Sequence, residues 1–273
     1  MSIEQQYYEN TELWKPEHYL GENTERFKKI SELIPCDSNS LLDVGCGNGL
    51  FLNHVKMLST TGFGRLCGTD RSSAALSLVQ TEKYLANITN LPFDDCEFDT
   101  VSALEVLEHL PQETYKAALA ELSRVANKHI IISVPFNQNL RLSLIECSEC
   151  HCHFNPNFHL RSFNDQKMES LLTNYGFKCS KTVHIFPERV MPNKVKKIIK
   201  AIGKVKRKIM NQPKNLVFGA ICPACGHFPK SNKVTSKSIS RKNQKNIWGK
   251  FSSLLELGYS WKWIAAIYER SKT

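Results

Sequence analysis

The chain has 273 residues, of which 41% are apolar, and this content is enough to bury a sizeable core. No apolar run reaches the roughly 18 residues of a membrane-spanning helix, and the polar start carries no signal peptide, so we expect a cytoplasmic protein, peripheral to a membrane at most. The net charge is +10, but residues 189–250 hold 17 Lys or Arg and no Asp or Glu, which indicates a local contact with an acidic partner rather than a chain wrapped by nucleic acid.

The first segment, residues 1–35, is rich in aromatic and charged side chains, and a helical pattern runs through Phe27, Ile30 and Leu33. Taken alone, this pattern predicts a helix that packs beside the core.

A glycine-rich turn follows the first buried strand, which is expected over residues 41–44. Gly45, Gly47 and Gly49 lead from this strand into a helix over about 48–58. Glycine allows positive φ and lets a ligand approach the backbone, and open α/β sheets bind nucleotides at such turns. The spacing is G-x-G-x-G and not the G-x-G-x-x-G pattern of dinucleotide-binding proteins. Asp43 would repel a pyrophosphate but attract a cationic ligand. The pattern therefore indicates S-adenosylmethionine, which carries ammonium and sulfonium charges.

Strands and helices then alternate, which predicts a parallel sheet. The ranges expected from the sequence are strands over 65–69, 97–103, 129–134, 177–185 and 263–268, and helices over 72–80, 112–126 and 164–174. Asn164 is expected to cap the last of these helices and Gly176 to end it.

Four blocks carry a resemblance to a known family: 41–49, 68–72, 87–99 and 105–110. In order and spacing they resemble class I S-adenosylmethionine-dependent methyltransferases, in the subgroup that modifies small molecules and lipids. The resemblance implies a Rossmann-like α/β fold with a seven-stranded, mostly parallel sheet, helices on both faces and an antiparallel last strand. It also implies that the N-terminal segment acts as a lid. The chain departs from the family at Ala86-Asn87, where Gly-Asp is common.

The same resemblance implies which residues hold the cofactor. The glycines would pass beneath it, Asp70 would accept hydrogen bonds from both ribose hydroxyls, and Asn87 and Ile88 would flank the adenine. The whole set is Asp43, Gly45, Cys46, Gly47, Asn48, Gly49, Asp70, Arg71, Asn87, Ile88 and Glu105. For Asp70, capping of the following helix is the alternative role.

Two histidines are candidates for a general base, which methyl transfer to a hydroxyl or a carbon acid would use. His109 lies in the fourth block and His159 follows the fifth strand. A structural role remains open for His109, and a role as a metal ligand or loop anchor for His159. The sequence Ala103-Leu-Glu-Val106 lacks the Pro-Pro signature of adenine N6 methylation, and no cysteine at this strand end supports cytosine C5 chemistry.

Two C-x-x-C pairs, Cys147/Cys150 and Cys222/Cys225, offer the four sulfurs of a closed structural zinc site. Their separation is longer than in a compact zinc ribbon. Nearby His151, Cys152, His153, His159 and His227 are alternative ligands. Unrelated thiols or an iron–sulfur cluster are the other interpretations.

Three parts are expected along the chain: a methyltransferase core with its lid over 1–188, a basic insertion with one C-x-x-C half-site over 189–250, and a helix and strand over 251–273 that complete the core. Within the insertion, apolar residues from Val195 to Ile209 recur at helical spacing among lysines. Such a helix lies on an anionic membrane surface or packs on the core.

The predicted function is in-line methyl transfer from S-adenosylmethionine to a small-molecule, sugar or lipid-linked acceptor. One alternative is an RNA-modifying enzyme whose basic, zinc-containing insertion grips the backbone, which we favour less. The other is a non-catalytic module that keeps the cofactor pocket.

Overall fold

The computed structural model describes residues 3–15, 22–58, 63–190, 220–227 and 258–271. The predicted amphipathic helix and most of the basic insertion lie outside these ranges, as does the predicted boundary at 250/251. Among the described residues, none of the helices combines the length and apolar character that crossing a membrane requires.

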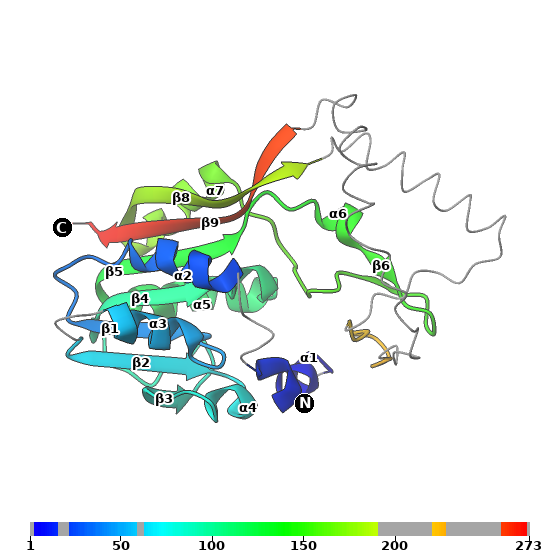
Figure 1. The fold of residues 1–273 in the computed structure, drawn as a ribbon, viewed down its shortest axis with the longest axis horizontal. Helices are drawn as coiled ribbons and strands as arrows, with labels where there is room; N and C mark the ends of the chain where they lie inside the picture. Colours follow the sequence, from blue (N-terminus) through cyan, green and yellow to red (C-terminus); the bar gives the residue numbers. More distant parts are fainter. Residues whose placement is uncertain (1–2, 16–21, 59–62, 191–219, 228–257, 272–273) are drawn as a thin grey trace. The chain divides into compact units, whose positions relative to one another are not determined.

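One seven-stranded sheet forms the centre of the fold, with the strand order β3-β2-β1-β4-β5-β9-β8 (Figure 1). The strands are β1 Ser40–Val44, β2 Arg65–Asp70, β3 Glu82–Leu85, β4 Phe98–Leu104, β5 Ala126–Pro135, β8 Phe177–Val190 and β9 Gly258–Arg270. The pairs from β3 to β5 are parallel, whereas β9 runs antiparallel to β5. The predicted fold class is therefore confirmed, including the antiparallel last strand.

The helices of this part cover both faces of the sheet. They are α1 Ile3–Tyr8, η1 Thr11–Trp14, α2 Glu22–Ser31, α3 Leu50–Leu58, α4 Ser73–Leu76, η3 Leu107–His109, α5 Gln112–Val125, α7 Asp165–Ser170 and η4 Thr173–Tyr175. Alternate residues of β5 face opposite layers: Ile130 and Ile132 pack with α5 and α7, and Ile131 packs with α2 and α3. Strands buried on both faces are typical of parallel sheets, and this explains their continuous apolar runs.

Two expectations about local structure were wrong. The helix predicted over 72–80 is a single turn, α4, and the strand β3 follows it. All four residues of β3 are exposed, so no apolar alternation marks this edge strand in the sequence. The helix predicted over 164–174 is divided into α7 and η4, although Asn164 caps it and Gly176, with φ of 79°, ends it as expected.

The described residues form two compact units. The first, the sheet unit, contains the described residues that fall within 1–138, 159–186 and 261–273, and the second contains those that fall within 139–158 and 187–260. The second unit carries a short helix, α6 Leu140–Ser143, and a two-stranded hairpin of β6 Ile145–Glu146 and β7 His153–Phe154. All residues of the cofactor motifs lie in the sheet unit, and all four cysteines of the two pairs lie in the second.

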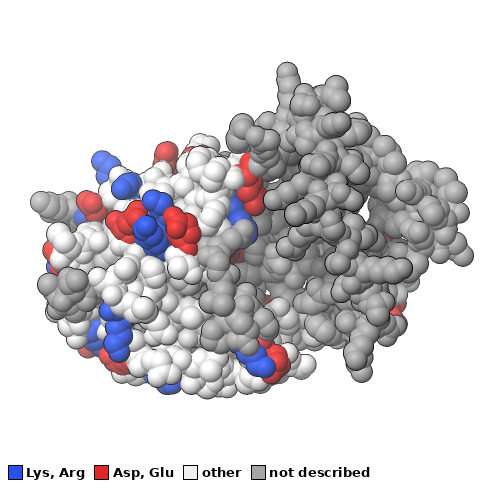
Figure 2. All heavy atoms as spheres, viewed as in Figure 1, with Lys and Arg blue, Asp and Glu red and all other residues white. Residues whose placement is uncertain are grey.

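Charged side chains of the sheet unit are paired locally. Arg65 contacts Glu82 at 2.7 Å and Glu97 at 2.6 Å. Figure 2 shows basic and acidic side chains side by side on the described part of one face, among uncharged residues. The excess of Lys and Arg thus belongs mainly to residues outside the described ranges.

Candidate functional site

The glycine turn after β1 leads directly into α3. Gly45, Gly47 and Gly49 have φ values of 74°, 55° and 76°, a region that other residues rarely adopt. A Cβ at Gly45 would lie 2.5 Å from Val106 Cγ2, and one at Gly47 would lie 2.8 Å from Trp14 Cζ3. The turn therefore needs glycine both for its conformation and for the close approach of its neighbours.

Asp70 ends β2 opposite this turn. Its Oδ2 accepts a hydrogen bond from the Gly47 N–H at 2.9 Å, and its Oδ1 accepts one from the Ser72 N–H at 2.8 Å. Burial raises the pKa of Asp70, while these N–H groups oppose the rise. The N-cap of α4 is Ser72, which accepts from the Ala75 N–H at 3.1 Å, so Asp70 does not fill that alternative role.

A cavity of about 240 Å³ opens at the carboxyl ends of β1, β2 and β4, where the strand order reverses. Seven residues predicted from the sequence line it: Gly45, Asp70, Arg71, Asn87, Ile88, Glu105 and His109. The lining also includes residues that the motifs did not identify, among them Glu4, Tyr8, Trp14 and Val106. The glycine turn, Asp70 and the Asn87-Ile88 pair thus line one cavity, although they are far apart in the sequence.

Other predicted cofactor residues lie behind this lining. Asp43 is only 2% exposed and accepts a hydrogen bond from Ser102 Oγ at 2.7 Å; burial raises its pKa to about 7. Cys46 is buried in the core beside Gly68. Asn48 donates from Nδ2 to the Trp14 carbonyl at 2.7 Å. None of these three, and neither Gly47 nor Gly49, belongs to the cavity lining; they shape the turn and its surroundings.

The N-terminal segment forms one side of the cavity. The Tyr8 carbonyl accepts hydrogen bonds from Trp14 Nε1 at 2.7 Å and from Ser72 Oγ at 2.8 Å, and Glu4 pairs with Arg71 at 2.8 Å. Residues of α1 therefore contact the two residues that follow β2.

At the other side of the cavity, carboxylates and imidazoles follow β4. Glu105 has φ of 59°, and its side chain contacts Trp263 Nε1 at 2.7 Å and Arg26 at 3.4 Å. Burial raises its pKa to about 7. His109 and His159 meet edge to face with ring centroids 4.8 Å apart. Only His109 lines the cavity, whereas burial lowers the pKa of His159 to about 4.

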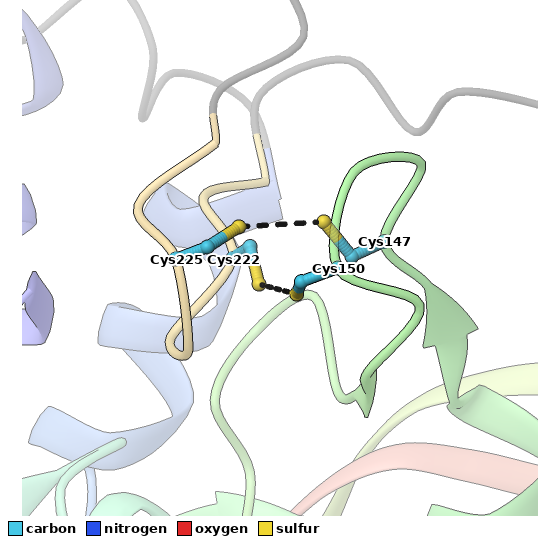
Figure 3. Close-up of side chains that lie close together, drawn as sticks. All are labelled: Cys147, Cys150, Cys222 and Cys225. Carbon is cyan, nitrogen blue, oxygen red and sulfur yellow. Dashed lines mark hydrogen bonds between the residues drawn. The ribbon is translucent and has the colours of Figure 1, made fainter.

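The two C-x-x-C pairs come together within the second unit, and Figure 3 shows their four side chains pointing toward one another. Cys147 Sγ lies 3.7 Å from Cys225 Sγ, and Cys150 Sγ lies 3.6 Å from Cys222 Sγ. A tetrahedron with Zn–S bonds of about 2.3 Å has sulfur–sulfur edges of about 3.8 Å. The cysteine cluster therefore fits a zinc ion, and the group of four includes none of the predicted alternative histidines.

The two pairs also share one turn geometry. In each, the residue after the second cysteine has positive φ, 60° at His151 and 72° at Gly226, and its N–H donates to the carbonyl of the first cysteine. The N–H of the first cysteine donates in turn to the carbonyl five residues on, at Cys152 or His227. Two matching turns facing each other form the kind of cage that holds one metal ion. A fifth thiol, Cys152 Sγ, lies 3.2 Å from Cys222 Sγ.

Comparisons with known proteins agree with this geometry. Residues 16–182 match the family described as "Methyltransferase domain", which is more than half of the chain. A ubiquinone biosynthesis O-methyltransferase of Albidiferax ferrireducens is 29% identical over 109 residues, 36% of this chain and 41% of that protein. An uncharacterised protein of Methanocaldococcus jannaschii is 36% identical over 120 residues, 41% of this chain and 49% of that protein. The matches thus span less than half the length of these relatives.

Solved structures show the same fold at low identity. A chain of the complex between the Haloferax volcanii Trm112 methyltransferase activator and its methyltransferase aligns with a TM-score of 0.54 at 12% identity, covering 98% of this chain and 96% of that one. The [4+2]-cyclase SpnF aligns at 0.52 and 13% identity, covering 92% and 82%, so the fold alone does not fix the reaction. The family match and the ordered motifs around one cavity do fix the family: the chain belongs to the class I S-adenosylmethionine-dependent methyltransferases.

Proposed function

We propose that the chain binds S-adenosylmethionine in the cavity and transfers its methyl group, by in-line displacement, to a small-molecule, sugar or lipid-linked acceptor. The observation that carries this proposal is Asp70, whose carboxylate faces the glycine turn in the same cavity as Asn87 and Ile88. A carboxylate can accept from both ribose hydroxyls, because both are donors. Two relatives are ubiquinone O-methyltransferases, which supports an acceptor oxygen.

Positioning supplies most of the catalysis in such a reaction. The sulfonium activates its own methyl group, and holding the acceptor in line contributes roughly 7–11 kcal/mol. Acidic side chains of the lining, Glu4, Asp70 and Glu105, favour a cationic ligand. Of the two predicted bases, His109 lines the cavity, which supports a part for it in activating a hydroxyl acceptor.

We infer that the cysteine cluster holds a structural zinc ion. Its four sulfurs leave no open coordination position, and their spacing matches a closed tetrahedral site. The ion would join the hairpin region around residue 150 to the segment 220–227, which are separated by about 70 residues in the sequence. No step of methyl transfer involves this ion.

Labelled methyl transfer tests the choice of acceptor. We expect the purified chain, given methyl-labelled S-adenosylmethionine and a cell extract, to place label in material that survives ribonuclease and partitions with small molecules or lipids. Label in RNA, with binding that falls steeply with salt, would support the RNA-modifying alternative instead. Cofactor binding with no transfer to any fraction would support the non-catalytic alternative. Co-sedimentation with anionic vesicles separately tests the predicted membrane contact of residues 189–250.

A further inference from the structure

A second group of metal-type ligands lies beside the cofactor cavity. One ligand atom from each of Glu108, His109 and His159 lies within 4.8 Å of the other two. The first two residues belong to η3, directly after β4, and His159 comes from a distant loop. A hydrogen bond of 2.8 Å from the Leu160 N–H to the Glu108 carbonyl holds the two segments together. The cluster is therefore part of the packed sheet unit.

Glu108 is the unusual member of this group. It is fully buried, at 0% exposure, and neither carboxylate oxygen has a hydrogen-bond partner among the described residues. A buried carboxylate without a partner is costly, and such groups are normally paired or bind metal. Its nearest cationic candidate is His109 Nε2, 4.0 Å from Oε1. Glu105 is already engaged by Trp263 and Arg26, so it does not compete for the same role.

His159 is held as a ligand would be. Its Nδ1 lies 2.6 Å from Gln138 Oε1, and an amide oxygen only accepts, so Nδ1 carries the proton. The lone pair then resides on Nε2. Metal-binding histidines commonly donate their other ring N–H to an oxygen in this way, which fixes the tautomer and the ring orientation.

We propose that Glu108, His109 and His159 bind a divalent first-row transition-metal ion, and that an open coordination position of this ion takes a hydroxyl oxygen of the methyl acceptor. Two imidazoles and one carboxylate suit Zn²⁺, Fe²⁺ or Co²⁺ better than Mg²⁺ or Ca²⁺, which prefer oxygen ligands. Three protein ligands leave positions free, as in catalytic rather than structural sites. Because His109 lines the cofactor cavity, the ion adjoins the place where the acceptor must bind.

This inference rests on the proposed function and names its acceptor class, a molecule with a hydroxyl group. The metal lowers the pKa of the bound hydroxyl, and its proton leaves to solvent. The oxygen then forms a bond to the methyl carbon as the bond from sulfur to that carbon breaks, with the electron pair going to sulfur. The products are the methyl ether, neutral S-adenosylhomocysteine and one proton. His109 thus acts as a ligand, and the metal replaces it as the means of deprotonation.

Titration with Co²⁺ tests the site in the full chain with zinc already on the cysteines. Wild type should bind one added Co²⁺ with visible bands of nitrogen and oxygen ligation and without the sulfur-to-cobalt charge-transfer band of a cysteine site. Glu108→Gln and His159→Asn should weaken binding by at least about tenfold, and Gln138→Leu by about 10–100-fold. His184→Asn is the matched control, since His184 pairs with Asp165 away from the cavity, and it should bind Co²⁺ as wild type does.

A parallel titration with S-adenosylhomocysteine separates this inference from the proposed function. Glu108→Gln should bind S-adenosylhomocysteine within about twofold of wild type, which also shows that the variant is folded. Wild type that binds S-adenosylhomocysteine but not Co²⁺ overturns the metal site and leaves the proposed function intact. Equal Co²⁺ affinity in wild type and Glu108→Gln overturns it as well.

Discussion

At the scale of single residues, Asp70 is the side chain on which cofactor binding depends most. Its two oxygens are already oriented by the N–H groups of Gly47 and Ser72, so little reorganisation is needed when ribose hydroxyls arrive. We predict that Asp70→Ala weakens S-adenosylhomocysteine affinity by at least about 100-fold, because hydrogen bonds to a charged group contribute about 1.5–3 kcal/mol each.

Calorimetric titration measures this change, with Asp99→Asn as the control, because Asp99 pairs with Lys128 and lies outside the cavity lining. Circular dichroism should show both variants folded. Wild-type affinity in Asp70→Ala would contradict the role given to this carboxylate.

Asp43 predicts a pH dependence of stability. Its pKa is about 7 in the folded chain because of burial, against an ordinary value of 3.8, so between these values the folded state holds one more proton than the unfolded state. The contribution of Asp43 to the free energy of unfolding is therefore full below pH 3.8 and is lost as the pH rises through about 7. We predict that, as the pH rises from 5 to 8, the free energy of unfolding of Asp43→Asn increases by roughly 2–3 kcal/mol relative to that of wild type.

Urea denaturation of both proteins at the two pH values gives this difference directly. Wild type should lose stability relative to the variant at the higher pH, where a buried charge must form. The same difference at both pH values would show that Asp43 is not buried as the structure has it.

The motif residues that line the cavity could be named from the sequence because each ends a strand or follows one. Glu105 and His109 belong to this class. The sequence could not distinguish Gly45, which lines the cavity, from Asp43 and Cys46, which lie in the same motif but are buried behind the lining. The sequence does not single out Glu108, because burial without a hydrogen-bond partner is a property of the packed chain and leaves no mark in the spacing of residues.

At the scale of elements, central strands were predictable and edge structure was not. β1, β4 and β5 are buried on both faces and read as apolar runs, whereas β3 forms through its pairing with β2 and has no apolar pattern of its own. The N-terminal helices illustrate the same limit. Their aromatic residues stand out in the sequence, but the approach of Trp14 to Gly47 depends on the fold.

We predict that the N-terminal segment contributes to cofactor affinity through Trp14. Its ring approaches the glycine turn and its Nε1 holds the Tyr8 carbonyl, so Trp14→Ala removes both a cavity wall and a tie within the segment. S-adenosylhomocysteine affinity should fall roughly five- to tenfold, as expected for losing one aromatic contact. The matched control is Trp261→Ala, at a half-exposed position on β9 outside the cavity lining. Equal effects in the two variants would argue against a lid.

At the scale of the whole molecule, the cofactor cavity and the cysteine cluster belong to different units. The cavity is built wholly by the sheet unit and the cysteine cluster wholly by the second unit. The two C-x-x-C pairs could be recognised from the sequence, since their spacing alone indicates a metal site. The association of residues 147–152 with 222–227 could not, because nothing local to either segment encodes it.

We predict that Cys222→Ser lowers the zinc content by one ion per chain in elemental analysis, because a closed four-sulfur site loses a ligand. Affinity for S-adenosylhomocysteine should change little, because the cavity contains no residue of the second unit. Cys36→Ser, at an exposed cysteine outside the cluster, should keep the zinc. Equal zinc content in the two variants would rule out the cysteine cluster as the site.

The most direct test is calorimetric titration of the purified wild-type chain with S-adenosylhomocysteine. The cavity between the glycine turn and Asp70 predicts one molecule bound per chain, with S-adenosylmethionine displacing it. A folded chain that binds neither compound would contradict the central claim that this cavity is a methyl-donor site.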